Sequence, residues 1–97
     1  MEITNSINSV PIRLTSERWT HIIENHDDLA GRMEDVLLAI EEPDWISQGY
    51  GNSLIAWRGF GSRNYLAVIY EKVNPNDGFV VTAYFTSKGG RRDKIWP

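Results

Sequence analysis

The sequence contains no cysteine, which excludes disulfide bonds, thiolate nucleophiles and cysteine-ligated metal sites. A chain without disulfides fits a reducing compartment, so we expect a cytoplasmic protein. No apolar run approaches the length that crosses a bilayer, and we expect no membrane association. The first residues also lack the basic start and apolar stretch of a secretion signal.

Motifs for metals and cofactors are missing as well. There is no P-loop, and no GxGxxG pattern opens a helix. His21 and His26 are five residues apart, so on a helix of about 3.6 residues per turn their side chains diverge by about 140°. No cluster of His, Asp and Glu residues has metal-ligand spacing. We therefore expect no metal and no cofactor.

The charge is divided unevenly along the chain. Residues 1–50 carry ten acidic and three basic residues, whereas residues 51–97 carry three acidic and seven basic ones, for a formal net charge of -3. A basic second half could attract phosphate groups. Acidic helices that only present a solvated face would produce the same division.

The sequence predicts one α+β domain over residues 1–97. Residues 1–11 are expected to form a loose arm or edge segment, because Pro11 argues against a central strand. One helix is predicted from Thr15 or Ser16 to about residues 26–28, and a second over residues 30–42, which Pro43 ends. Strands are predicted at 44–48, 53–58, 64–72 and 79–86, and their short loops imply antiparallel neighbours. The expected fold is a two-layer sandwich, with two N-terminal helices packed on an antiparallel sheet of about four strands.

His26 stands where a core residue would be expected. Trp19, Ile22, Ile23 and His26 lie at i, i+3, i+4 and i+7, on one face of the first predicted helix. The apolar stripe therefore ends in an imidazole, the side chain that titrates nearest to neutral pH. The helix C-terminus and the two aspartates after His26 favour imidazolium, which suits a general acid or a phosphate contact. A structural histidine inside the fold would give the same pattern.

The last predicted strand carries hydroxyl groups on one face. Strict alternation places Phe79, Val81, Ala83 and Phe85 on one side and Val80, Thr82, Tyr84 and Thr86 on the other. A basic segment follows, with Lys88, Arg91, Arg92 and Lys94. Hydroxyl groups followed by cations are typical of a surface that contacts nucleic-acid phosphates and bases. An ordinary solvated strand would have a similar composition.

Arg58 and three tryptophans leave further alternatives open. Arg58 ends the predicted strand 53–58, where its planar donor fork could hold a phosphate or could pair with Glu24. Trp45, Trp57 and Trp96 could form a surface for a protein partner.

Several of these features occur together in a fixed order. They are Ile12–Thr15, the pattern W-x-H-I-x-x-x-H that His26 closes, the strand pattern V-V-T-A-Y-x-T, and a basic segment before Ile95–Trp96. Over about residues 12–97 the chain resembles small phage- and bacterium-borne domains of the barnase–EndoU–colicin–RelE-like (BECR) ribonuclease fold. The resemblance implies a metal-independent ribonuclease, often a toxin or phage-associated effector, which an antitoxin or immunity protein would bind. The resemblance points to His26, Thr82, Tyr84 and Thr86 as functional residues, together with Arg58 and Lys88.

The expected function is therefore a cytoplasmic, metal-independent endoribonuclease that cleaves RNA by acid/base transesterification. The expected catalytic residues are His26, Arg58, Tyr84 and Thr86. The expected substrate-binding residues are Thr82, Lys88, Arg91 and Arg92. The alternative is a non-catalytic protein-interaction module of a two-component system, similar to a toxin–antitoxin pair.

Overall fold

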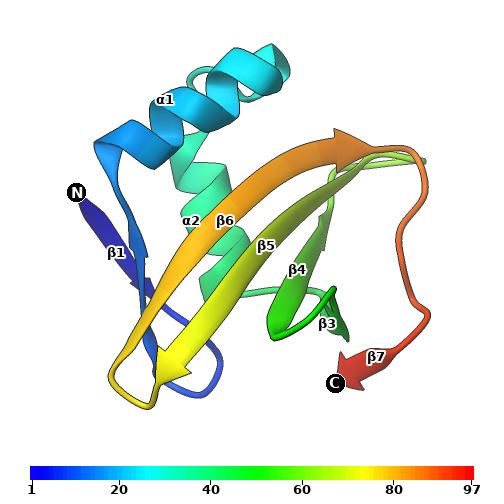
Figure 1. Cartoon of the computed structure of the whole chain (residues 1–97). Coiled ribbons are helices and arrows are strands. Elements are labelled where there is room, and N and C mark those ends of the chain that lie inside the picture. Colours follow the sequence, from blue (N-terminus) through cyan, green and yellow to red (C-terminus); the bar gives the residue numbers. More distant parts are fainter.

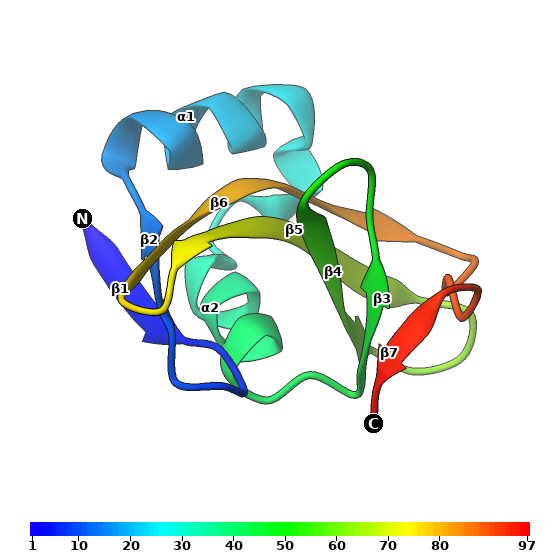
Figure 2. The ribbon, with the colours of Figure 1, turned by 60° about the horizontal axis from the view of Figure 1, so that its bottom comes forward.

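A seven-stranded sheet and two short helices make up the computed structural model, which describes residues 1–97. The strands are β1 (Glu2–Asn5), β2 (Pro11–Leu14), β3 (Trp45–Gln48), β4 (Ser53–Gly59), β5 (Tyr65–Asn74), β6 (Asp77–Thr86) and β7 (Lys94–Trp96). The helices are α1 (Ser16–Asn25) and α2 (Met33–Glu41), separated by η1, a 3-10 turn over Asp27–Leu29. The strand order is β1-β2-β6-β5-β4-β3-β7. Figures 1 and 2 show α2 against one face of the sheet and α1 alongside β6.

The predicted four-stranded antiparallel sheet is wrong, because three further strands join it. Strands β3 to β6 form the expected antiparallel meander, and β1, β2 and β7 extend it. Strand β2 lies between β1 and β6 and runs parallel to β6, with Ile12 beside Gly78 and Arg13 beside Phe79, so the sheet is mixed. Pro11 does not prevent this pairing, because it is the first residue of β2, where a missing N–H is tolerated.

Local chemistry determines where the helices begin and end. The Thr15 side chain accepts a hydrogen bond from the Arg18 N–H at 3.1 Å and so caps α1. Helix α2 begins at Met33 rather than at residue 30, because Gly31 has a φ of 80° that no helix contains. It ends just before Pro43, which cannot continue a helix.

The main core lies between the helices and one side of the sheet. It contains 14 buried residues, among them Ile22 of α1, Ile40 of α2 and Val68 of β5. Trp19 and Ile23 pack against it, which confirms that the predicted apolar stripe of α1 faces the protein interior. Each large apolar side chain buried here contributes about 1.5–3 kcal/mol. We call this side of the sheet the helix-facing side and the opposite one the distal side.

A β-bulge in β6 decides which of its side chains face the helices. The register between β5 and β6 skips Val81, which has no partner. As a result, Val80 and Ala83 both lie in the helix-facing core, while Val81 lines a groove on the distal side. The predicted alternation is therefore wrong from Phe79 to Val81, because Phe79 pairs with Glu71 on the distal side and Val80 faces the helices. From Thr82 onward it holds, and Tyr84 packs against a small core on the distal side.

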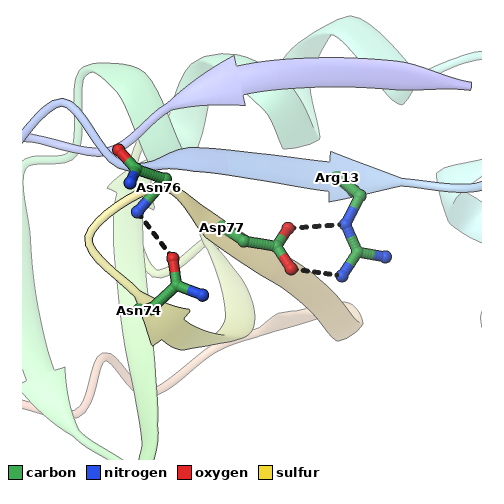
Figure 3. Close-up of polar contacts among 4 residues, drawn as sticks. All are labelled: Arg13, Asn74, Asn76 and Asp77. Carbon is green, nitrogen blue, oxygen red and sulfur yellow. Dashed lines mark hydrogen bonds and ion pairs between the residues drawn. The ribbon is translucent and has the colours of Figure 1, made fainter.

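An ion pair fixes β2 to the first residue of β6. Nε and Nη2 of Arg13 donate to the two carboxylate oxygens of Asp77 at 2.7 and 2.9 Å (Figure 3). In the turn that precedes β6, the Asn76 N–H donates to the side-chain oxygen of Asn74 at 2.8 Å. The hydrogen bonds from Arg13 hold the pKa of the Asp77 carboxyl below its ordinary value, and Asp77 raises the pKa of Arg13.

The variant Asp77→Asn should be less stable than the wild type at neutral pH, and the difference should shrink in acid. Because its pKa is lowered, the Asp77 carboxylate stabilises the folded state above its unfolded pKa of about 3.9, and this contribution disappears as the pH falls through the folded-state pKa. Urea midpoints between pH 7 and pH 2 measure the difference. Asp93→Asn, which removes an exposed carboxylate outside both ion pairs, is the control. A difference that stays constant down to pH 2 would contradict this account.

The variant Tyr70→Phe should be as stable as the wild type or more stable by about 1 kcal/mol, because the buried Tyr70 hydroxyl has no hydrogen-bond partner. Burial raises the pKa of Tyr70 to about 12. The wild type should therefore lose stability as the pH rises from about 10 towards the folded-state pKa, and the variant should lose less. Thermal midpoints from pH 7 to pH 11 test both effects. Tyr50→Phe, at a side chain that is 98% exposed, is the control. A Tyr70→Phe protein that is clearly less stable at pH 7 would show that the hydroxyl is bonded.

Candidate functional site at the free edge of β6

The second half of β6 is a free edge beside α1. Strand β2 pairs with β6 only at Gly78 and Phe79, so no strand flanks residues 80–86 on this side. His26 is the C-cap of α1, and its ring lies 6.0 Å from the ring of Tyr84, centroid to centroid, at a tilt of 37°. The structure therefore brings together two of the four predicted catalytic residues.

The imidazole of His26 is half-buried but has no polar partner within the protein. None of the side-chain hydrogen bonds involves it, and neither does either of the two ion pairs. A histidine with a structural role normally satisfies its ring nitrogens inside the fold. The ring nitrogens of His26 are therefore free for a ligand, and the ring of Tyr84 lies beside the imidazole.

Tyr84 is one end of a row of directly paired residues that crosses four strands on the distal side. The row runs from Trp45 in β3 through Trp57 in β4 and Ala67 in β5 to Tyr84 in β6. The first three form a second, small core. The predicted tryptophan surface is therefore wrong for Trp45 and Trp57, which are only 3% and 4% exposed, whereas Trp96 is 37% exposed.

Residues 87–93, which we call the strap, cover the two buried tryptophans. Figure 1 shows this segment leaving the end of β6 on the side away from α1 and running to β7 beside β3. The indole N–H of Trp45 donates to the carbonyl of Gly90 at 2.7 Å. A Cβ at Gly90 would lie 2.7 Å from the Cζ2 atom of Trp57, so the backbone of the strap rests directly on the rings. The guanidinium of Arg91 lies over the Trp45 ring, 4.2 Å from its centroid.

Thr86, which was predicted to be catalytic, and the remaining predicted substrate-binding residues lie around this edge and along the strap. Thr82 and Thr86 share the distal side of β6 with Tyr84 and are half-buried. The Thr86 hydroxyl accepts a hydrogen bond from the Lys88 N–H at 3.3 Å. The side chains of Lys88 and Arg92 are exposed and take part in neither ion pair.

Arg58, the fourth predicted catalytic residue, does not lie with His26 and Tyr84 at the free edge of β6. It follows Trp57 in β4 and therefore points to the helix-facing side, opposite to Tyr84. Its guanidinium donates to the backbone carbonyl of Glu42 at the end of α2 and does not pair with Glu24. A cation at this position is favourable for the C-terminus of a helix.

Arg32 also reaches β6, and the sequence did not indicate it. Its guanidinium lies 5.3 Å from the ring centroid of Phe85, and its Nη1 atom is 3.3 Å from a carboxylate oxygen of Asp35. Phe85 follows Tyr84, so the free edge carries a guanidinium on its helix-facing side and an imidazole on its distal side. No local pattern marks Arg32, because it precedes α2 in a loop and only the tertiary fold places it beside β6.

The hollows of the surface lie away from His26. Two adjoining grooves of about 320 and 170 Å³ surround the start of α1 and share Thr15 and Arg18. A third groove, of about 390 Å³, lies on the distal side between the β3–β4 turn and strands β4, β5 and β6. None of the three includes His26 or Tyr84, so the candidate site is an open edge. Such a site is better suited to a polymer than to an enclosed small molecule.

The structure groups no three His, Asp or Glu residues in a way that could hold a metal ion. Neither helix is long and apolar enough to cross a membrane. Comparison with known proteins finds no matching family model, no matching curated protein and no matching solved structure. The resemblance to BECR nucleases therefore stays a prediction from the residues.

The variant Gly90→Ala should loosen the strap, because its Cβ would press on the ring of Trp57, a buried side chain that cannot move aside. We expect a loss of about 1–3 kcal/mol in unfolding free energy and a red shift of tryptophan emission. Urea unfolding followed by fluorescence measures both. Gly59→Ala is the control, because its Cβ would meet only a carboxylate of Asp44 at 3.6 Å. Equal effects of the two variants would contradict the close packing of the strap.

Proposed function

We propose that the protein is a metal-independent endoribonuclease in which His26 is the general acid. The observation that carries this proposal is the imidazole of His26, which lies against Tyr84 at a free sheet edge without any polar partner. The hydroxyl groups of Thr82 and Thr86 and the cations of the strap supply contacts for a phosphodiester backbone. The resemblance to BECR ribonucleases supports the same conclusion from the sequence.

The reaction proposed for this edge is an internal transesterification of RNA. The ribose 2′-oxygen attacks the adjacent phosphorus and loses its proton to water, while the bond from phosphorus to the 5′-oxygen breaks. His26 in its imidazolium form gives a proton to the departing 5′-oxygen. The Tyr84 hydroxyl donates a hydrogen bond to a non-bridging phosphate oxygen, whose negative charge grows in the transition state. The products are one RNA that ends in a 2′,3′-cyclic phosphate and one that begins with a 5′-hydroxyl.

The distal groove offers space for an unpaired base next to this edge. Half-buried Ile55, Ile69 and Val81 line it, and fully exposed Tyr50 stands at its rim. Ile69 is the direct cross-strand partner of Thr82, so the groove adjoins the hydroxyl groups of β6. Apolar and aromatic surfaces of this kind stack unpaired bases, which favours single-stranded RNA as the substrate.

A toxin that cleaves cellular RNA damages the cell that produces it. We therefore propose that this chain acts as a toxin or a phage-associated effector. An antitoxin or immunity protein would bind it and block its activity. The free edge of β6 beside His26 is the surface that such an inhibitor would have to cover.

Purified protein should cleave a single-stranded RNA in the presence of EDTA and leave 2′,3′-cyclic phosphate ends. Because general acid catalysis contributes about 10²–10⁴-fold, His26→Gln should lower the rate by at least about 100-fold. His21→Gln is the matched control, since His21 is exposed on the same helix and does not contact Tyr84. Denaturing gels of end-labelled RNA give the rates, and mass spectrometry identifies the ends.

Two results would overturn this proposal, namely no cleavage by the wild type on any single-stranded RNA, or equal rates for the wild type and His26→Gln. If the wild type is inactive and a pull-down yields a stable stoichiometric protein partner, the chain is a non-catalytic interaction module.

A further inference from the structure

Three planar groups are stacked around Trp45. This residue is the end of the row of paired residues from Trp45 to Tyr84 that lies farthest from His26. The rings of Trp57 and Trp45 are nearly parallel, with centroids 5.6 Å apart and planes inclined by 8°. The guanidinium of Arg91 lies over Trp45 at 4.2 Å, and the ring of Tyr65 meets Trp45 edge-on at 5.8 Å. A guanidinium over an indole is favourable because the cation faces the negative side of the ring.

The backbone on both sides of Arg91 is also anchored. Gly90 accepts the hydrogen bond from the Trp45 indole, and the carbonyl of Asp93 accepts one from the Gln48 N–H at 2.9 Å. The strap therefore holds Arg91 over the ring from both directions. Its guanidinium is restricted before any ligand arrives, and less conformational freedom is lost on binding.

The N–H groups of this guanidinium remain free. Arg13, Arg32 and Arg58 each donate to a protein oxygen, whereas Arg91 is exposed and donates no hydrogen bond. Stacking occupies the flat face of a guanidinium and leaves the N–H groups at its edge pointing outward. This edge matches two oxygens of a phosphate in a bidentate contact. Arg92, the next residue, has the same charge but no stacking partner.

The row of paired residues from Trp45 to Tyr84 connects this stack to the free edge of β6. Trp45 and Tyr84 are three strands apart in one row, which at about 4.8 Å per strand is roughly 14 Å. A phosphate at Arg91 is therefore not the one beside His26. We propose that Arg91, stacked on Trp45, binds a non-scissile phosphate of single-stranded RNA, and that Trp45 is a positioning residue for this contact. The inference rests on the proposed function for the class of ligand.

The stack favours a strand whose bases are unpaired. The surface between Arg91 and His26 is lined by half-buried aromatic side chains, Tyr65 and Tyr84, which can contact bases while the phosphate is held. A duplex presents its bases to each other and has no unpaired ring to place there.

The test uses binding alone, with a fluorescent 2′-O-methyl oligonucleotide that cannot be cleaved through its 2′-oxygen. Arg91→Ala should weaken binding by about fivefold to tenfold and lower the slope of log Kd against log salt by about 0.7, the value for one phosphate contact to a single strand. Arg92→Ala is the matched control and should have a smaller effect on both quantities. Arg91→Lys should keep the salt slope but lose part of the affinity, because a lysine lacks the flat fork.

The role of Trp45 is tested by two further variants. Trp45→Leu should weaken binding as much as Arg91→Ala does, although no charge is removed, and Trp45→Phe should restore most of the affinity. Melting curves show that each variant is folded at the assay temperature. A labelled duplex of the same sequence should bind more weakly than the single strand.

Several outcomes would overturn the proposal. They are no binding of the single strand by the wild type, equal effects of Arg91→Ala and Arg92→Ala on the salt slope, or tighter binding of the duplex. Because the probe is not cleaved, failure of the nuclease activity is seen separately. A protein that binds through Arg91 but does not cleave RNA would keep this inference and overturn the proposed function.

Discussion

The bulge at Val81, which has no partner in β5, decides which side chains of β6 face the helices and which face the distal side of the sheet. In an unbroken strand, alternation from the buried Val80 would send Tyr84 towards the helices and Ala83 to the distal side. The bulge reverses this arrangement from Thr82 onward. Small Ala83 then fits beneath the helices, and Tyr84 stands on the distal side, where it meets His26. Bulges are frequent next to functional sites because they redirect side chains in this way.

The helices and the meander could be predicted because their signals are local. A period of 3.6, the cap at Thr15 and the stop at Pro43 are all contained in short windows of sequence. Strands β1, β2 and β7 have only three or four residues each, and β2 and β7 join the meander through strands that lie far along the chain. The bulge was also invisible, since Val80 and Val81 are equally suited to either side of a strand.

In the candidate site, too, features with a local sequence pattern could be predicted, and features that depend on tertiary contacts could not. His26 and Tyr84 each carry a local pattern, and the structure places them together. The hydrogen bond of Arg58 to the Glu42 carbonyl and the contact of Arg32 with Phe85 depend instead on the tertiary fold, because no window of sequence contains both partners. Adjacent arginines in the strap look identical in sequence, yet only Arg91 has a ring beneath it. His26, Tyr84 and the strap arginines were therefore predictable as site residues, whereas the part played by Arg32 and the stacking of Arg91 depended on tertiary contacts.

The parallel pairing of β2 with β6 also has a consequence for the order of folding. Ile12 and Gly78 are 66 positions apart, so their contact closes a long loop. The conformational entropy of this loop must be lost before β2 pairs with β6. The meander from β3 to β6 needs only near neighbours and can assemble first. Until β1 and β2 dock, the whole of β6 is an open template for strands of other chains. Completion of the Arg13–Asp77 contact therefore marks the point at which a newly folded molecule closes part of its aggregation-prone edge.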